Sequence, residues 1–149
     1  MRVFTRTLVP LLFAMTIHAQ NQPTTLNALR DQARPLLIFG GAHDTRVEQQ
    51  YAILAAHAQG AKERDMQVVL LTNSKARMHG NARPPEAAFT PEEAGLMHKR
   101  FDVSPNQFTV ILVGKDGGEK LRSQMPIAWD KLAATIDAMP MRKDEMKQR

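Results

Sequence analysis

The chain has no cysteine among its 149 residues. This absence excludes disulfide bonds, zinc–thiolate sites, Cys-X-X-Cys redox motifs and cysteine nucleophiles. Aromatic residues are also few, with one tryptophan and one tyrosine, and no dense stripe of basic residues occurs. Together with the export signal described next, these features argue against nucleic acid as a partner. Because disulfide bonds are excluded, packing of the hydrophobic core must stabilise the fold. A chain of 149 residues with 43% hydrophobic content is large enough to form such a core.

The first nineteen residues have the pattern of an export signal. Arg2 and Arg6 give a positive start, Leu8 to Ile17 are mostly apolar, and Ala19 offers a small residue for cleavage. The apolar stretch is shorter than the roughly 20 residues of a membrane span. We therefore expect residues 1–19 to be a signal peptide, with no transmembrane segment after cleavage and a periplasmic or secreted mature protein. A buried N-terminal element and an uncleaved anchor are the alternatives.

Hydrophobic patterning in the first half of the mature chain predicts a parallel pair of strands. Pro35–Phe39 and Gln67–Thr72 are continuous apolar runs, typical of strands buried on both faces. Between them, apolar residues recur every three or four positions, which predicts one helix over residues 44–64. A strand, a helix and a strand in this order form a right-handed crossover. Residues 24–34 are either a short helix or an irregular lead-in.

The middle of the chain contains a long polar stretch followed by a clear helix start. Residues 73–89 have no periodic pattern and are expected to form a loop. Thr90–Glu93 then combine a capping threonine, a proline at the first helical position and a glutamate three residues after the cap. This capping box predicts a helix that carries the apolar residues Ala94, Leu96, Met97 and Phe101.

The last third predicts a β-hairpin and a final helix. Residues 108–113 are strongly β-prone, 114–118 have the composition of a tight turn, and 119–122 form a short polar strand expected at a sheet edge. Apolar residues spaced as on a helix face follow over residues 126–139, and Pro140 ends the helix before a frayed helix or polar tail. The order β-α-β-α-β-β-α predicts an α/β, thioredoxin-like fold. Its central mixed sheet would have about four strands, with helices on both faces.

Four segments carry a resemblance to a known family: Arg34–Phe39, Glu63–Asp65, Phe101–Gly118 and Ile136–Arg142. With them the chain resembles the DUF4174 family over about residues 25–147. The resemblance implies a thioredoxin- or peroxiredoxin-like fold, export, and kinship with a domain of animal extracellular-matrix proteins that also carry sushi repeats. It implies no catalytic residue, cofactor or established activity.

The candidate ligand site is the corner after the first strand, formed by Gly40, Gly41, His43, Asp44 and Arg46, together with Phe108. Redox-active thioredoxins carry their two cysteines at this corner, and a cis-proline at the place of Phe108. The corner lies beyond the carboxyl end of a buried strand and at a helix N-terminus, where α/β sheets bind ligands and anions. In the alternative interpretation, Asp44 caps the helix, the glycines form the turn, and His43 and Arg46 are solvated.

Three functions are compatible with these patterns. The first is a non-catalytic exported domain that binds a protein or a small ligand in the cell envelope, without a metal or cofactor. The second is a non-thiol enzyme that uses His43, Asp44 and Arg46 at the corner. The third is copper handling by methionine and histidine, with Met78-His79 and Met97-His98 among the candidates, although Met97 also falls on an apolar helix face.

Overall fold

The computed structural model describes residues 26–41, 43–72 and 90–148. Its centre is a four-stranded mixed sheet in the order β2-β1-β3-β4. The strands are β1 (Arg34–Gly40), β2 (Met66–Thr72), β3 (Thr109–Val113) and β4 (Glu119–Ser123). β1 pairs with β2 in parallel, and β3 runs antiparallel to both β1 and β4. The predicted parallel pair and the predicted hairpin are confirmed.

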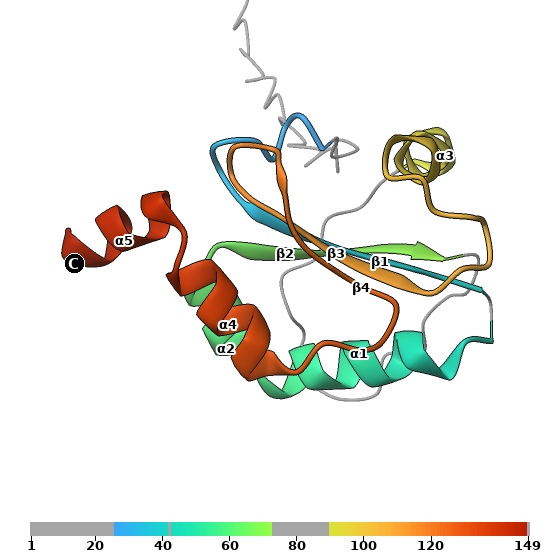
Figure 1. Ribbon diagram of the computed structural model, residues 1–149, viewed down its shortest axis with the longest axis horizontal. Helices are drawn as coiled ribbons and strands as arrows, with labels where there is room; N and C mark the ends of the chain where they lie inside the picture. The colour runs from blue at the N-terminus through green and yellow to red at the C-terminus, as the bar shows by residue number, and fades with distance from the viewer. Residues whose placement is uncertain (1–25, 42, 73–89, 149) are drawn as a thin grey trace, which may run out of the picture.

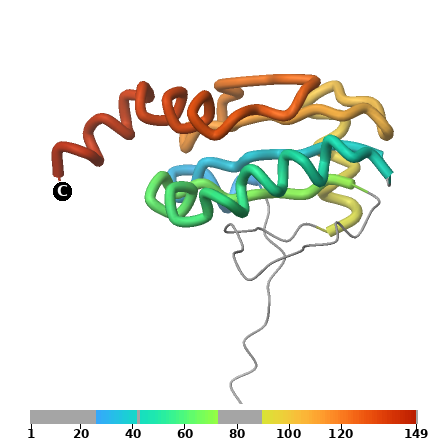
Figure 2. The backbone as a smooth tube through the Cα atoms, turned by 90° about the horizontal axis from the view of Figure 1, so that it is seen from below, coloured from blue at the N-terminus to red at the C-terminus, as the bar shows by residue number. Residues whose placement is uncertain are grey.

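Five helices lie around the sheet in the part of the chain that the structure describes. They are α1 (Thr45–Ala56), α2 (Ala58–Glu63), α3 (Pro91–Arg100), α4 (Trp129–Asp137) and α5 (Pro140–Lys147). Helices α1, α2 and α4 cover one face of the sheet and α3 covers the other (Figure 1). Helix α5 continues from α4 past the end of the sheet, as both views of the chain show (Figures 1 and 2). The predicted thioredoxin-like arrangement is therefore confirmed.

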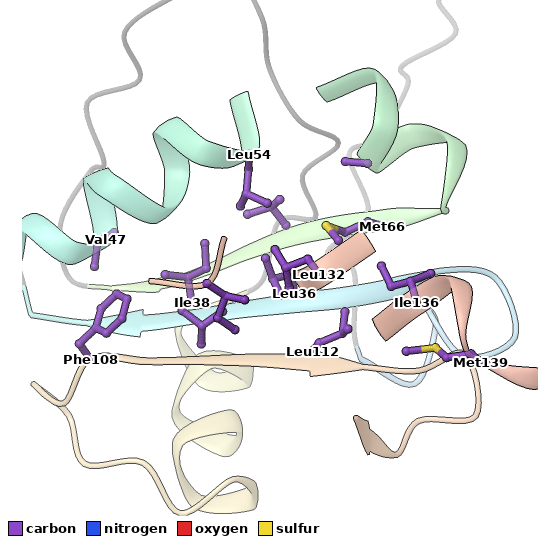
Figure 3. Close-up of a cluster of buried hydrophobic side chains, with 14 residues drawn as sticks. Leu36, Ile38, Val47, Leu54, Met66, Phe108, Leu112, Leu132, Ile136 and Met139 are labelled. Atoms are coloured by element: carbon purple, nitrogen blue, oxygen red, sulfur yellow. The ribbon is translucent and has the colours of Figure 1, made fainter. Parts of the chain in front are cut away.

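β1 is the centre of the core, and all seven of its residues are buried. Alternate side chains point to opposite faces of a strand. Leu36 and Ile38 accordingly join the cluster beneath α1, α2 and α4, which includes Ile136 (Figure 3). Leu37 and Phe39 join the cluster beneath α3. Burial on both faces explains why the sequence of β1 is continuously apolar instead of alternating.

The helix predicted over residues 44–64 is in fact two helices that meet at His57. This residue leaves the helical conformation, with φ −124° and ψ 29°. Its Nδ1 lies 2.9 Å from the carbonyl oxygen of Ile53, and its ring stacks on Trp129 with a centroid distance of 5.0 Å. Gly60 brings α2 close to the same tryptophan, because a Cβ there would lie 2.5 Å from Trp129 Cζ2. A tertiary contact that the local sequence does not encode therefore accompanies the break.

The last helix was predicted to end at Pro140, and the structure adds α5 directly after it. Pro140 is the first residue of α5, a position where its missing N–H and fixed φ are harmless. Residues 141–147, predicted to be a frayed helix or tail, thus form a helix whose Arg142 is buried. Proline here separates two helices instead of ending the structured chain.

The structure decides between the two conformations predicted for the lead-in before β1. Residues 26–32 form successive turns, so the irregular alternative is confirmed and the helix is not, while Leu26 and Leu29 are buried. Of the apolar residues predicted for α3, Met97 is buried against the sheet and Leu96 is 49% exposed.

Some predictions concern residues outside the described ranges. The predicted signal peptide, residues 1–19, and the whole predicted loop, residues 73–89, belong to this group, so both stay predictions. Among the described helices, none has the length and apolar character needed to cross a membrane.

Candidate functional site

At the predicted corner, Asp44 and Arg46 form an ion pair with each other. Asp44 is the N-cap of α1, and its Oδ1 accepts hydrogen bonds from the backbone N–H of Arg46 at 3.0 Å and from Arg46 Nε at 2.9 Å. Asp44 Oδ2 accepts from Arg46 Nη2 at 2.7 Å. The hydrogen bonds from the Arg46 side chain hold the pKa of Asp44 below its ordinary value. The guanidinium also lies over the ring of Phe108, 4.9 Å from its centroid. Both charges of the corner therefore already have partners.

The remaining corner residues support this closed arrangement. A Cβ on Gly40 would lie 2.5 Å from Val47 Cγ2, so the glycine allows α1 to approach the end of β1. Gly41 lies beside Asn106, where an added Cβ would be 3.7 Å from Asn106 Oδ1, an ordinary contact. His43 is exposed and has no hydrogen bond recorded with any described residue. Four of the predicted residues therefore lie together at the corner: Gly40, Asp44, Arg46 and Phe108. No hydrogen bond connects His43 to them.

A second site lies at the other end of the sheet, about 20 Å from the corner at 3.3 Å per strand residue. Arg34, the first residue of β1, is fully buried. Its Nη1 donates to the carbonyl oxygen of Arg64 at 2.9 Å, and its Nη2 donates to Glu145 Oε1 at 2.9 Å. Asp65 Oδ2 lies 3.7 Å from Arg34 Nη1. A buried guanidinium thus connects the start of the sheet to α5.

Glu145 of α5 is the carboxylate on which this second site converges. Lys115 Nζ donates to Glu145 Oε1 at 2.8 Å and to Asp65 Oδ2 at 2.8 Å. Arg142 Nη1 lies 3.4 Å from Glu145 Oε2. Partial burial raises the pKa of Glu145, but hydrogen bonds from Arg34 and Lys115 outweigh that effect and lower the pKa to about 2. Glu145 is therefore held as a carboxylate by three surrounding cations.

Asp137 at the end of α4 extends the same arrangement. It accepts two hydrogen bonds from Arg64, at 3.1 and 2.7 Å, and one from Arg142 Nε at 3.3 Å. The guanidinium of Arg64 also lies 5.6 Å from the ring centroid of Trp129. The ion cluster, as we call it below, comprises Arg34, Arg64, Asp65, Lys115, Asp137, Arg142 and Glu145.

The sequence does not predict the ion cluster, although six of its seven members lie in the segments that carry the family resemblance and only Glu145 lies outside them. Each of the four segments that carry the family resemblance supplies at least one member of the cluster. In the sequence, Arg34 directly precedes a proline at the start of a predicted strand, and Lys115 lies in a predicted turn. A basic residue directly before a buried strand was the available signal, because a charge there must find partners.

A cavity of about 270 Å³ opens beside the ion cluster. It lies between the turn that joins β3 to β4 and the junction of α4 with α5. Its lining comprises Arg34, Gly114, Lys115, Asp116, Lys120, Met139, Pro140 and Met141. Three cationic side chains, the carboxylate of Asp116 and an apolar wall therefore line one small space.

The methionine and histidine pairs proposed for copper are placed differently by the structure. Met97 is buried in the core beneath α3. His98 Nδ1 lies 2.9 Å from the carbonyl oxygen of Val103, and its ring meets Phe39 edge-on at 5.0 Å. Met78-His79 lies outside the described residues. Within residues 26–41, 43–72 and 90–148, no three histidine or acidic side chains are grouped as a metal site requires.

The fold is shared with thiol enzymes of known structure. A reduced 2-Cys peroxiredoxin from Plasmodium vivax is 12% identical, with a TM-score of 0.58 over 80% of this chain and 84% of that one. The thioredoxin domain of a thiol-disulfide oxidoreductase from Bacteroides vulgatus is 13% identical, with a TM-score of 0.56 over 75% and 81%. Peroxidoxin BcpB from Mycobacterium tuberculosis is 16% identical, with a TM-score of 0.57 over 76% and 84%. At such identities the likeness concerns the fold alone.

Sequence comparison gives one further match. The profile of a family described as "Domain of unknown function (DUF4174)" matches residues 25–145. No curated protein sequence matches the chain.

Proposed function

Since this chain belongs to the DUF4174 family, whose function is unknown, we propose from its own structure that it is an exported, non-catalytic binding domain. In this proposal a thioredoxin-like scaffold binds another macromolecule or a small ligand in the cell envelope. Export is inferred from residues 1–19, and the short leader and absence of cysteine favour the periplasm over full secretion.

The observation that carries the proposal is the state of the corner after β1. The chain has no cysteine with which to attack a peroxide or a disulfide. The place at the start of α1 is instead filled by the Asp44–Arg46 pair, which is closed on itself and covered on one side by Phe108. A thioredoxin-like scaffold without a thiol cannot perform thiol–disulfide exchange, because the thiolate is the reacting group.

The enzyme hypothesis at the same corner has less support. General acid–base catalysis needs a base within hydrogen-bond reach of the group that it serves. Asp44 accepts hydrogen bonds from the α1 N-terminus and from the Arg46 side chain, and His43 has no recorded hydrogen bond to either residue. The corner therefore has the contacts of a helix cap.

The experiment has two arms. In the first, the purified protein is assayed for insulin-disulfide reduction and for peroxide reduction with dithiothreitol, beside an active thioredoxin and a buffer blank. We expect rates equal to the blank, and turnover above it contradicts the proposal. In the second, the tagged protein is crosslinked in its own compartment and its bound molecules are identified. Recovery in the cytosolic fraction contradicts the exported part of the proposal.

A further inference from the structure

The ion cluster has one positive charge more than it has negative charges. Its cations are Arg34, Arg64, Lys115 and Arg142, and its anions are Asp65, Asp137 and Glu145. At the rim of the cavity, Lys120 Nζ pairs with Asp116 Oδ2 at 2.6 Å, and this neutral pair leaves the net charge at +1. The side chains of Arg34, Lys115 and Arg142 are only 1%, 11% and 6% exposed, and a buried cation is costly unless an anion accompanies it. The excess charge therefore favours the binding of one anion.

The buried guanidinium is also incompletely satisfied. Arg34 is fully buried and lines the cavity, and its Nε has no hydrogen-bond partner among the described residues. Buried polar groups in proteins are nearly always paired, so an orphan donor calls for an explanation. Because the Nε atom is itself buried, Arg34 contributes its positive charge to the cavity and no direct hydrogen bond from Nε.

The N-terminus of α5 contributes a third feature to the same cavity. Met139 is the N-cap, and its side chain makes no capping hydrogen bond. Pro140 and Met141, the first two residues of the helix, form part of the cavity lining. The first N–H groups of a helix lack intrahelical acceptors and attract anions. The positive end of α5 thus adds to the attraction of the lysines.

We propose that the cavity lined by Arg34, Lys115, Lys120 and Met139–Met141 binds the carboxylate of a small organic acid. This inference rests on the proposed binding function and adds its place and its chemistry. A single excess positive charge matches a monoanion better than a doubly charged phosphate. The walls of Met139, Pro140 and Met141 would contact a short apolar body, and about 270 Å³ is at the small end of ligand cavities.

The test is isothermal titration calorimetry of the purified protein at neutral pH with acetate, butyrate, hexanoate and inorganic phosphate. We expect dissociation constants of about millimolar or tighter for the longer acids. Affinity should rise by up to about fourfold for each methylene that the apolar wall covers. Phosphate should bind more weakly than butyrate. Tighter binding of phosphate than of butyrate, or an affinity independent of chain length, overturns the proposal.

Two matched lysine variants locate the binding. Lys120→Gln removes a cation from the cavity wall and should weaken butyrate binding at least several-fold. Lys143→Gln removes the same charge from an exposed position of α5 that does not line the cavity, and should change the affinity less than twofold. Equal losses in both variants mean attraction by overall charge and contradict the proposal. Lys120 is an exposed residue of the edge strand β4, and circular dichroism verifies that this variant is folded.

Failure of this inference is distinguishable from failure of the proposed function. If no acid binds but the protein still captures a partner in its compartment and lacks thiol turnover, only the carboxylate site is refuted. If turnover above the blank is measured, the non-catalytic function is refuted whatever the titration shows.

Discussion

Replacement of Glu145 by glutamine tests how strongly the ion cluster ties α5 to the sheet. The pKa of Glu145 is lowered from 4.5 to about 2, despite its partial burial, by hydrogen bonds from Arg34 and Lys115. Such a shift corresponds to a contribution of about 3 kcal/mol to the free energy of unfolding at neutral pH. Because the folded-state pKa is the lower one, this contribution is complete above about pH 5 and disappears as the pH falls through 4.5 towards 2.

Glutamine is close in shape to a protonated glutamate, so Glu145→Gln mimics the acid form at every pH. We expect the variant to be less stable than the wild type by about 3 kcal/mol at pH 7, and by roughly 1 kcal/mol at pH 3. The assay is urea unfolding followed by circular dichroism at both pH values. Asp144→Asn is the matched control, because Asp144 is the preceding residue of α5 and its pair with Lys147 is exposed, at 66% and 76%. That variant should be nearly as stable as the wild type.

Two outcomes would refute the reasoning. A Glu145→Gln protein as stable as the wild type at pH 7 means that the three cations around this carboxylate contribute nothing. A deficit of the same size at pH 7 and pH 3 means that glutamine destabilises α5 by some route other than loss of charge.

Three further substitutions test α1, α2 and α3. Gly60→Ala should lower the free energy of unfolding by about 1–3 kcal/mol, because its Cβ would overlap the ring of Trp129, and this exceeds the helix-propensity gain of about 1 kcal/mol. Gly95→Ala, where no atom of the described residues lies within 4 Å of the added Cβ, should instead raise the free energy of unfolding by up to about 1 kcal/mol, and urea unfolding of both variants measures the difference. Asp44→Ala should cost about 1 kcal/mol through loss of the α1 cap, with thiol assays still at the level of the blank; a neutral effect on stability contradicts the capping role.

Much of the fold was predictable because local patterns and tertiary packing agree. β1 and β3 are continuous apolar runs, as strands buried on both faces must be, and Thr90 caps α3 through the N–H of Glu93 at 3.2 Å. The break between α1 and α2 was not predictable, because it coincides with stacking of His57 on Trp129, 72 residues later in the chain. Hydrophobic periodicity continues across this break, so it gives no warning of it.

Of the two sites, the corner after β1 was predictable from the sequence and the ion cluster was not. The role of Asp44 as a helix cap was predictable, because Asp44 directly precedes a segment whose apolar residues recur with helical spacing. The structure agrees with that interpretation, since Asp44 is the N-cap of α1. The ion cluster could not be read from spacing, because Arg34 and Glu145 are 111 residues apart and meet only when α5 folds against the end of the sheet. Each charged residue looks like an ordinary surface residue until its partners are known.

We propose that this thioredoxin-like domain binds an anionic ligand at the α5 end of the sheet, and not at the corner after β1. Backbone amide chemical shifts of the isotope-labelled protein, recorded by NMR during a titration with butyrate, test it most directly. We predict saturable shifts concentrated in residues 114–120 and 139–142, with residues 40–46 unaffected. Shifts concentrated in residues 40–46, or no saturable shift anywhere, would contradict the claim.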